Sequence, residues 1–400
     1  MLNIYERLGV RTLINASGPA TRLSGSIMPP EVADAMREAS QYCVDIAELQ
    51  ARASEIIADI TGAEAGYVTS GAAAGLLLGT AACVTGLDPG KMNRLPDTTG
   101  MKNEVLIPRS HRNFYDHAVR SAGVRLVEVG IADRFSGAGV RDTEAWEIAD
   151  AVTERTAAVC YVAYSHSLPP LSAVVDVAHA AGVPVLVDAA GQLPPASNLR
   201  RFIAEGADLV AFSGGKAIRG PQSSGILCGR RDLIAAAALQ HLDLDILFDQ
   251  WHPPPSLIDK NRLPGAPQHG IGRPCKVGKE EIVGLLTALK LFVDEDPEVR
   301  RQRWLRLMEG LASALQDIRH TEVSVVADRK RDVPAVQLKL DEALLGLSAL
   351  DLITQLQDGE PSIHANPTRV SEGVVLFGPM CLKDGEPELI GLRVRMVLKF

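Results

Sequence analysis

The chain has 400 residues, of which 46% are hydrophobic and 22% are charged, and this balance predicts a globular protein with room for one large and one smaller domain. Its formal net charge of -8 excludes an overall field that would attract a polyanion, and no local cluster of Lys and Arg compensates for it. We therefore expect no nucleic acid partner.

The cysteines and the apolar stretches indicate a cytoplasmic protein without a metal site or a membrane segment. The six cysteines are scattered, with no CxxC pair and no histidine at metal-ligand spacing, so we expect reduced thiols. Near the N-terminus, Glu6, Arg7 and Arg11 interrupt the apolar core that a signal peptide would need. Residues 65–87 are uncharged but rich in Gly, Ser and Thr, which favours a strand, a turn and a helix over a membrane span.

Short apolar runs alternate with helical patterns through most of the first 300 residues, and this alternation predicts an α/β fold. Several of the runs are apolar throughout, as expected for a mostly parallel sheet that is covered by helices on both faces. The predicted strands are residues 65–69, 105–108, 124–129, 157–164, 183–188, 209–212 and 225–228. The predicted helices are residues 30–60, 72–84, 113–123, 172–181 and 198–206.

The C-terminal part of the chain has a different pattern. A long helical stretch starts at Glu280, with a break expected at Pro297, and it is long enough to connect two domains. Beyond it we predict one helix at residues 348–357. We also predict strand-like segments at residues 335–340, 373–377 and 392–398. We therefore expect an N-terminal segment and a large domain in residues 1–290 and a small α+β domain in residues 291–400. Residues 249–274 are rich in proline and predict a long ordered loop, which is usually functional.

The segment TSGAAAG, Thr69 to Gly75, follows a predicted strand and opens an Ala-rich helix. Free backbone N–H groups at such a helix start, together with the Ser70 hydroxyl beside Gly71 and Ala72, would form a phosphate site. The same pattern also fits a serine that only caps the helix, followed by small residues for close packing.

Asp188 ends the almost entirely apolar segment VPVLVD, where a carboxylate is costly to bury unless a cation or strong hydrogen-bond donors meet it. Ligands of open parallel sheets bind at the carboxyl ends of the strands, which is where Asp188 is predicted to lie. The alternative is an aspartate that caps the following turn.

Lys216 lies in SGGKAIRGPQSSG, directly after the predicted strand 209–212 and at the same end of the sheet as Asp188. The surrounding glycines would let the backbone pack tightly around a bound group, although an exposed surface lysine is the plain alternative. A P-loop is excluded, because Walker A needs a glycine separated by four residues from Gly-Lys and a Ser or Thr after it, where this chain has Val210 and Ala217.

A phosphate cradle, a buried carboxylate and a lysine in a glycine-rich loop together match the needs of pyridoxal 5'-phosphate. The lysine would form a Schiff base, and the carboxylate would pair with the pyridinium nitrogen, so that the ring withdraws electrons from the substrate Cα. His111, in IPRSHRNFYDH after another predicted strand, is a candidate to lie flat on the ring, or else a structural histidine.

These residues lie in motifs that resemble the fold-type I, or aspartate aminotransferase-like, enzymes that use pyridoxal phosphate. More narrowly, the sequence is similar to the group related to bacterial selenocysteine synthase that includes D-glucosaminate-6-phosphate ammonia-lyase. The resemblance covers most of residues 1–289 and is looser in the C-terminal domain. Its motifs are TSGAAAG, SHRNFYDHAVRSAG, LVDAAGQLPP, DLVAFSGGKAIRGPQSSGIL and GIGRPCKVGKEEIVGLLTAL.

The resemblance implies a role for each matching residue. It makes Lys216 the Schiff-base lysine, Asp188 the pyridinium partner and His111 the ring-stacking residue. The implied phosphate ligands are Ser70, Gly71, Ala72 and Ser213. It also implies that Arg273, in the GIGR turn, reaches a phosphate or a substrate carboxylate across the interface of a homodimer, although an ion pair at the surface is an equal alternative.

The function that the resemblance implies is a pyridoxal phosphate-dependent lyase. Such an enzyme would eliminate water from a hydroxy amino acid or amino sugar acid and release a 2-oxo acid and ammonia, with Lys216 as general base. His166 and Tyr164 are candidate substrate contacts, and Arg219 and Arg273 are candidates to bind a substrate phosphate.

Other functions fit the same residues. An amino acid racemase, an aldolase or an aminotransferase would need the same cofactor site, and so would a protein that senses pyridoxal phosphate or is kept for partner binding. A transfer of selenium to tRNA is not expected, because the acidic chain lacks a basic surface for so large an anion.

Overall fold

The computed structural model describes residues 3–131, 141–328 and 333–399, and it divides into two compact units. The larger unit comprises residues 28–292, and the smaller unit comprises residues 1–27 and 293–400. Residues 1–27 thus group with the C-terminal part of the chain, whereas the sequence placed them in the large domain. A strand pairing explains this, because β1 (Leu13–Asn15) runs parallel to β11 (Ser362–His364).

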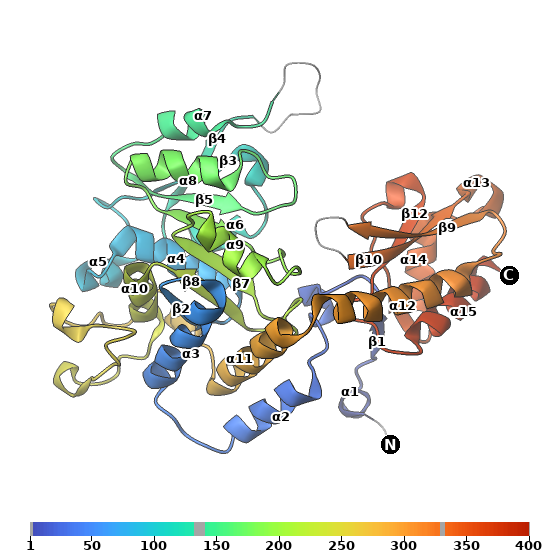
Figure 1. Ribbon diagram of the computed structural model, residues 1–400, viewed down its shortest axis with the longest axis horizontal. Coiled ribbons are helices and arrows are strands. Elements are labelled where there is room, and N and C mark those ends of the chain that lie inside the picture. Colours follow the sequence, from blue (N-terminus) through green and yellow to red (C-terminus); the bar gives the residue numbers. More distant parts are fainter. Residues whose placement is uncertain (1–2, 132–140, 329–332, 400) are drawn as a thin grey trace. The chain divides into compact units, whose positions relative to one another are not determined.

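The larger unit is built around a seven-stranded sheet with the strand order β2-β8-β7-β6-β5-β3-β4 (Figure 1). All pairs are parallel except those of β8, which runs antiparallel to both β2 and β7. The strands are β2 (Ala65–Thr69), β3 (Glu104–Pro108), β4 (Arg125–Val129), β5 (Thr156–Val162), β6 (Val185–Asp188), β7 (Leu209–Ser213) and β8 (Gly225–Gly229). The predicted α/β class and the mostly parallel sheet are confirmed.

Helices pack on both faces of this sheet. On one face, a Cβ added to Gly79 of α4 would lie 3.3 Å from the Leu209 side chain of β7, so this helix packs closely on the strand. Phe212, three residues along β7, points to the opposite face and meets Phe202 of α9 at 6.1 Å between ring centroids. The helices of this unit are α2 (Pro30–Ala39), α3 (Ile46–Thr61), α4 (Ala72–Thr85), α5 (Pro89–Arg94), α6 (Asp116–Arg120), α7 (Ala145–Asp150), α8 (Leu171–Ala180), α9 (Asn198–Ala204) and α10 (Arg231–His241).

The prediction of one continuous helix at residues 30–60 was wrong, because α2 and α3 are separate. Asp45 caps α3 by accepting hydrogen bonds from the N–H groups of Ala47 at 2.7 Å and Glu48 at 3.0 Å. An aspartate in this position stabilises a helix start, so a new helix begins here. The apolar pattern continues across this point and therefore did not reveal the break.

The smaller unit contains a three-stranded antiparallel sheet in the order β12-β10-β9. Its elements are α1 (Ile4–Arg7), α12 (Pro297–Leu315), β9 (Thr321–Asp328), β10 (Val333–Leu340), α13 (Glu342–Leu345), α14 (Ala349–Asp358), β12 (Val374–Phe377) and α15 (Glu386–Leu398). The strand-like reading of residues 392–398 was wrong, because they belong to α15. Ile390, Val394 and Leu398 follow one another at the helical spacing of four and are all buried.

α11 (Lys279–Asp294) carries the chain from the larger unit into the smaller one, and α12 starts at Pro297, where the sequence predicted a break. Among the described residues, no helix combines the length and the apolar character needed to cross a membrane.

Candidate active site

Asp188 and Lys216 lie at one edge of the sheet because they follow neighbouring parallel strands. Asp188 is the last residue of β6 and pairs with Ala211 of β7, and Lys216 follows β7 in a turn. The carboxyl ends of these strands therefore bring the carboxylate and the amine to the same edge, as the sequence predicted.

The Asp188 carboxylate is held in a poorly solvated place. The residue is 8% exposed, and its Oδ1 accepts a hydrogen bond from the N–H group of Ala190 at 3.0 Å. Burial raises the pKa of Asp188, while the hydrogen bond from Ala190 and the positive charge of Lys216 partly offset this rise. A buried carboxylate with a raised pKa is suited to a cationic partner.

The turn that carries Lys216 is closed by glycines. The N–H of Gly214 donates to the carbonyl of Ser224 at 2.9 Å, and the N–H of Gly220 donates to the carbonyl of Gly214 at 2.9 Å. A Cβ on Gly215 would lie 2.6 Å from Cα of Gln222, so only glycine allows this approach of two backbones. The half-buried lysine is thus presented from a tightly packed turn.

The start of α4, where the sequence predicts a phosphate cradle, lies at the same edge of the sheet. Gly71 has φ +129°, and no side chain caps the helix, so the first N–H groups of α4 remain available to a ligand. A Cβ on Gly225, the first residue of β8, would lie 2.5 Å from the carbonyl carbon of Gly71 and 2.7 Å from the nitrogen of Ala72. Ser213 pairs with Gly225 and therefore lies at the same edge.

Ser70 and Arg273 have partners within the chain. The Ser70 hydroxyl donates to the carbonyl of Cys275 at 2.7 Å. The Arg273 guanidinium donates to the Asp243 carboxylate at 2.6 Å, which is the ion pair that the sequence left open. The loop that contains Arg273 and Cys275 thus contacts the cradle.

His111 lies behind the edge of the sheet, after β3. It is 1% exposed, its Nδ1 accepts a hydrogen bond from the N–H group of Val162 at 3.3 Å, and its ring meets Tyr161 edge-on at 4.7 Å between centroids. Because Val162 pairs with Asp188, His111 and Asp188 belong to the same edge.

Of the remaining candidates, Tyr164 and His166 are exposed and Arg219 is half-buried. Tyr164 is 39% exposed and stacks on His166 at 5.5 Å between centroids, and its hydroxyl accepts a hydrogen bond from Asn113 at 3.0 Å. Arg219 has φ +63° in the turn after Lys216.

Sequence reasoning missed two buried residues next to the cradle. The Tyr67 hydroxyl lies 2.9 Å from Nδ1 of His241, and Nε2 of His241 lies 2.9 Å from the carbonyl oxygen of Cys275. Tyr67 and His241 are 174 positions apart, and no spacing in the sequence links them. Asp243, Asp245 and His269 also approach one another, but they lie at the surface and Arg273 already occupies Asp243.

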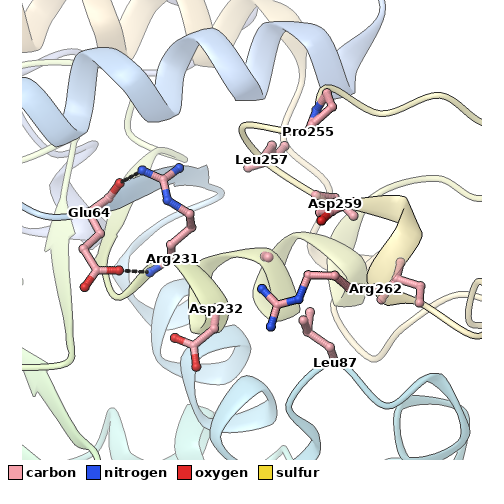
Figure 2. A pocket seen from close by; sticks show the side chains of 11 residues that line it. Glu64, Leu87, Arg231, Asp232, Pro255, Leu257, Asp259 and Arg262 are labelled. Atoms are coloured by element: carbon pink, nitrogen blue, oxygen red, sulfur yellow. Dashed lines mark hydrogen bonds between the residues drawn. The ribbon is translucent and has the colours of Figure 1, made fainter.

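A cavity of about 260 Å³ lies at the opposite edge of the sheet, where β2 begins and β8 ends (Figure 2). Figure 2 shows that Arg231 donates from its backbone N–H to the Glu64 carboxylate at 3.0 Å and from its guanidinium to the Glu64 carbonyl at 2.6 Å. The same guanidinium donates to the carbonyl of Ser256 at 2.9 Å. These bonds hold the proline-rich loop against α10, and a function for that loop stays a prediction.

The residues at the carboxyl edge fit pyridoxal phosphate. The open start of α4, where Gly71 has φ +129° and Gly225 is too close to it to carry a side chain, suits a phosphate, and the buried Asp188 suits a protonated pyridine nitrogen. Lys216 supplies an amine after β7, which lies between β2, the strand before α4, and β6, the strand that ends at Asp188. This donor set would hold the cofactor by its phosphate, its ring nitrogen and its aldehyde.

Comparisons with known proteins identify the family. Residues 14–249 match the family described as SelA, L-seryl-tRNA selenium transferase. The chain is 32% identical to D-glucosaminate-6-phosphate ammonia lyase from Salmonella typhimurium, over 99% of this chain and 98% of that protein. It is 34% identical to 5'-C-glycyluridine monooxygenase-decarboxylase from a Streptomyces species, over 96% of this chain and 90% of that protein.

Solved structures agree as well. The structure of D-glucosaminate-6-phosphate ammonia-lyase matches with a TM-score of 0.82 and 31% identity, covering 100% of this chain and 99% of that chain. Aspartate aminotransferase from Thermus thermophilus matches with a TM-score of 0.50 and 17% identity, over 98% of this chain and 93% of that chain, which supports the fold alone. The expected fold class and the expected cofactor are therefore confirmed, and the chain belongs to the L-seryl-tRNA selenium transferase family of pyridoxal phosphate-dependent enzymes.

Proposed function

We propose that the protein is an ammonia-lyase that removes water from a β-hydroxy amino acid or an amino sugar acid and releases a 2-oxo acid and ammonia. The observation that carries the proposal is the meeting of Asp188, Lys216 and the open start of α4 at one edge of the sheet. The relative of known ammonia-lyase activity, which aligns with almost the whole chain, favours elimination over the other reactions of this cofactor.

The atoms balance without an oxidant. The substrate loses a proton from Cα and a hydroxyl from Cβ, and the released enamine takes up water to give the 2-oxo acid and ammonia. Bound pyridoxal phosphate supplies the electron sink that makes the Cα proton acidic. We propose that the Lys216 amine, in the tight turn after β7, takes the proton from Cα. The same amine then gives a proton to the departing hydroxyl, which leaves as water.

Asp188 and His111 support this step. We propose that Asp188 keeps the pyridine nitrogen protonated, because its buried carboxylate is stabilised by a cation beside it. His111 is proposed to cover the ring, held by the N–H of Val162 and the edge of Tyr161. The backbone and hydroxyl donors proposed for the phosphate are Ser70, Gly71, Ala72 and Ser213, with Arg273 as a further candidate.

We also propose a cytoplasmic homodimer that acts on a small molecule and not on tRNA. The described cysteines form no disulfide bond, as expected in a reducing compartment, and the net charge is negative. Beside His111, Phe114 is 99% exposed and Tyr115 is 59% exposed, and apolar surface of this kind next to a site favours a second copy of the chain. Sedimentation of wild type and Phe114→Asp tests this, and a monomeric wild type contradicts it.

The activity is tested with a panel of D- and L-hydroxy amino acids and phosphorylated amino sugar acids. Ammonia and 2-oxo acid should appear in equal amounts from one of them, with wild type and with the control Lys91→Ala, and not with Lys216→Ala. Lys91 is an exposed lysine of α5 and controls for the loss of a charge.

The relative from Streptomyces provides the second candidate, an oxidative decarboxylation. Carbon dioxide release and oxygen consumption are therefore measured in the same reactions. Oxygen uptake without ammonia would overturn the lyase proposal in favour of this candidate, and ammonia without oxygen uptake supports the lyase.

A further inference from the structure

A chain of hydrogen bonds connects the interior of the larger unit to the phosphate cradle. The Tyr67 hydroxyl lies 2.9 Å from Nδ1 of His241, whose Nε2 lies 2.9 Å from the carbonyl oxygen of Cys275. The same carbonyl accepts a hydrogen bond from the Ser70 hydroxyl at 2.7 Å. Tyr67 is fully buried and His241 is 3% exposed, so water does not replace these partners easily.

The direction of each bond follows from the groups involved. A backbone carbonyl only accepts, so Nε2 of His241 carries a hydrogen and donates it to Cys275. Burial lowers the pKa of His241, the hydrogen bond to the Cys275 carbonyl partly offsets this, and the positive charge of Arg273 lowers the pKa further. This favours a neutral ring, in which Nε2 carries the hydrogen and Nδ1 accepts from Tyr67. Burial raises the pKa of Tyr67 and keeps its hydroxyl protonated.

The loop that carries Cys275 is also anchored without His241. The N–H of Gly272 donates to the carbonyl of Gln240 at 2.9 Å, and the N–H of Ile271 donates to the Gln240 side chain at 3.1 Å. A Cβ on Gly270 would lie 2.3 Å from Cα of Gln240, so this loop packs directly on the end of α10. The bond from His241 is therefore not required to hold the loop in place.

Ser70 has one hydroxyl hydrogen and two possible acceptors. In this structure the hydrogen goes to the Cys275 carbonyl. A phosphate at the start of α4, which rests on the function proposed above, would compete for the same hydrogen, because a dianion is the stronger acceptor. If Ser70 turns to the phosphate, the bond from His241 still gives the carbonyl a donor within the described part of the chain.

We propose that His241 is a positioning residue that frees the Ser70 hydroxyl for the cofactor phosphate by satisfying the Cys275 carbonyl in its place. His241 does not touch the cofactor in this account. Tyr67 fixes the tautomer that makes His241 a donor toward Cys275.

The test measures the affinity of the cofactor-free protein for pyridoxal phosphate and for pyridoxal, which lacks the phosphate, by absorption titration. His241→Leu removes the donor and should weaken binding of pyridoxal phosphate about tenfold, while binding of pyridoxal stays unchanged. His241→Gln can donate from its amide and should restore most of the loss. Tyr67→Phe, which keeps the ring, should weaken only pyridoxal phosphate, by about threefold.

Gln240→Leu is the matched control, because it removes a buried hydrogen bond to the same loop and leaves the Cys275 carbonyl untouched. It should lower Tm without changing the ratio of the two affinities. If His241→Leu weakens the binding of both ligands equally, or weakens neither, the proposal is overturned. If His241→Leu does not fold, the same comparison is made with Tyr67→Phe. A wild type that binds neither ligand overturns the cofactor site itself, which distinguishes the two failures.

Discussion

Asp188→Asn separates the role of this carboxylate in the chemistry from its effect on the fold. Asparagine keeps the oxygen that accepts from Ala190 and removes the charge. Because burial raises the pKa of Asp188, the ionised carboxylate destabilises the cofactor-free protein at neutral pH, with Lys216 as a partial compensation. The variant should therefore have a higher Tm than the wild type when no cofactor is bound.

The pH dependence of this difference has a definite sign. In the wild type, the loss of folding stability caused by the Asp188 charge develops as pH rises from the usual carboxyl pKa through the raised pKa of folded Asp188. At lower pH the carboxyl group is protonated in both states and this loss is absent. The difference in Tm between Asp188→Asn and the wild type should therefore develop over that range and persist above it. Calorimetry of the cofactor-free proteins across the pH range measures it.

The effect on activity is opposite to the effect on stability. Loss of one preorganised charge partner should lower kcat about 10²–10³-fold, and added pyridoxal phosphate should raise Tm less in the variant than in the wild type. The assay is ammonia release at saturating cofactor, on the substrate that the panel identifies.

Asp208→Asn is the matched control, because Asp208 is also buried but carries structural bonds. Its carboxylate accepts from the N–H of Val185 at 2.8 Å and from Nε2 of His179 at 2.7 Å, and it pairs with Arg230 at 3.2 Å. This substitution should cost about 1–3 kcal/mol of stability and leave kcat unchanged. A lower Tm in cofactor-free Asp188→Asn, or an unchanged kcat, would refute the reasoning for Asp188.

Two further predictions concern the cradle and its loop. Gly225→Ala would place a Cβ 2.5 Å from the backbone of Gly71, so it should lower the free energy of unfolding by about 1–3 kcal/mol and weaken cofactor binding. The control Gly265→Ala has open space around it and should change neither quantity. Thermal unfolding measures the stability, and absorption titration measures the binding. Arg273→Gln removes a positive charge that lowers the pKa of His241, so NMR titration of that histidine should give a higher pKa; an unchanged value would contradict the proximity of the two residues.

The strand ends were predictable because their signals are local. Asp188 follows an apolar run and Lys216 follows another, and parallel strands with helical crossovers place both ends at one edge. The glycines around Lys216 and at Gly71 also have a local meaning, since each stands where a backbone approaches another or a helix begins.

The features that sequence reasoning missed depend on distant pairings. The bond between Tyr67 and His241 forms only when β2 and α10 pack together. No motif in the sequence near either residue predicts this contact. Residues 1–27 joined the smaller unit through three residues of β1, too short for periodicity to detect. Residues 392–398 alternate in polarity like a strand, but Ile390, Val394 and Leu398 bury a helical face.

The central claim is that Lys216 is the lysine that bonds the cofactor, and borohydride reduction of the protein loaded with pyridoxal phosphate tests it most directly. Peptide mass mapping should find the reduced cofactor on Lys216, and Lys216→Ala should lose this label and the visible absorption band. A label on another lysine, or no label on a wild type that folds normally, would contradict the assignment and the function built on it.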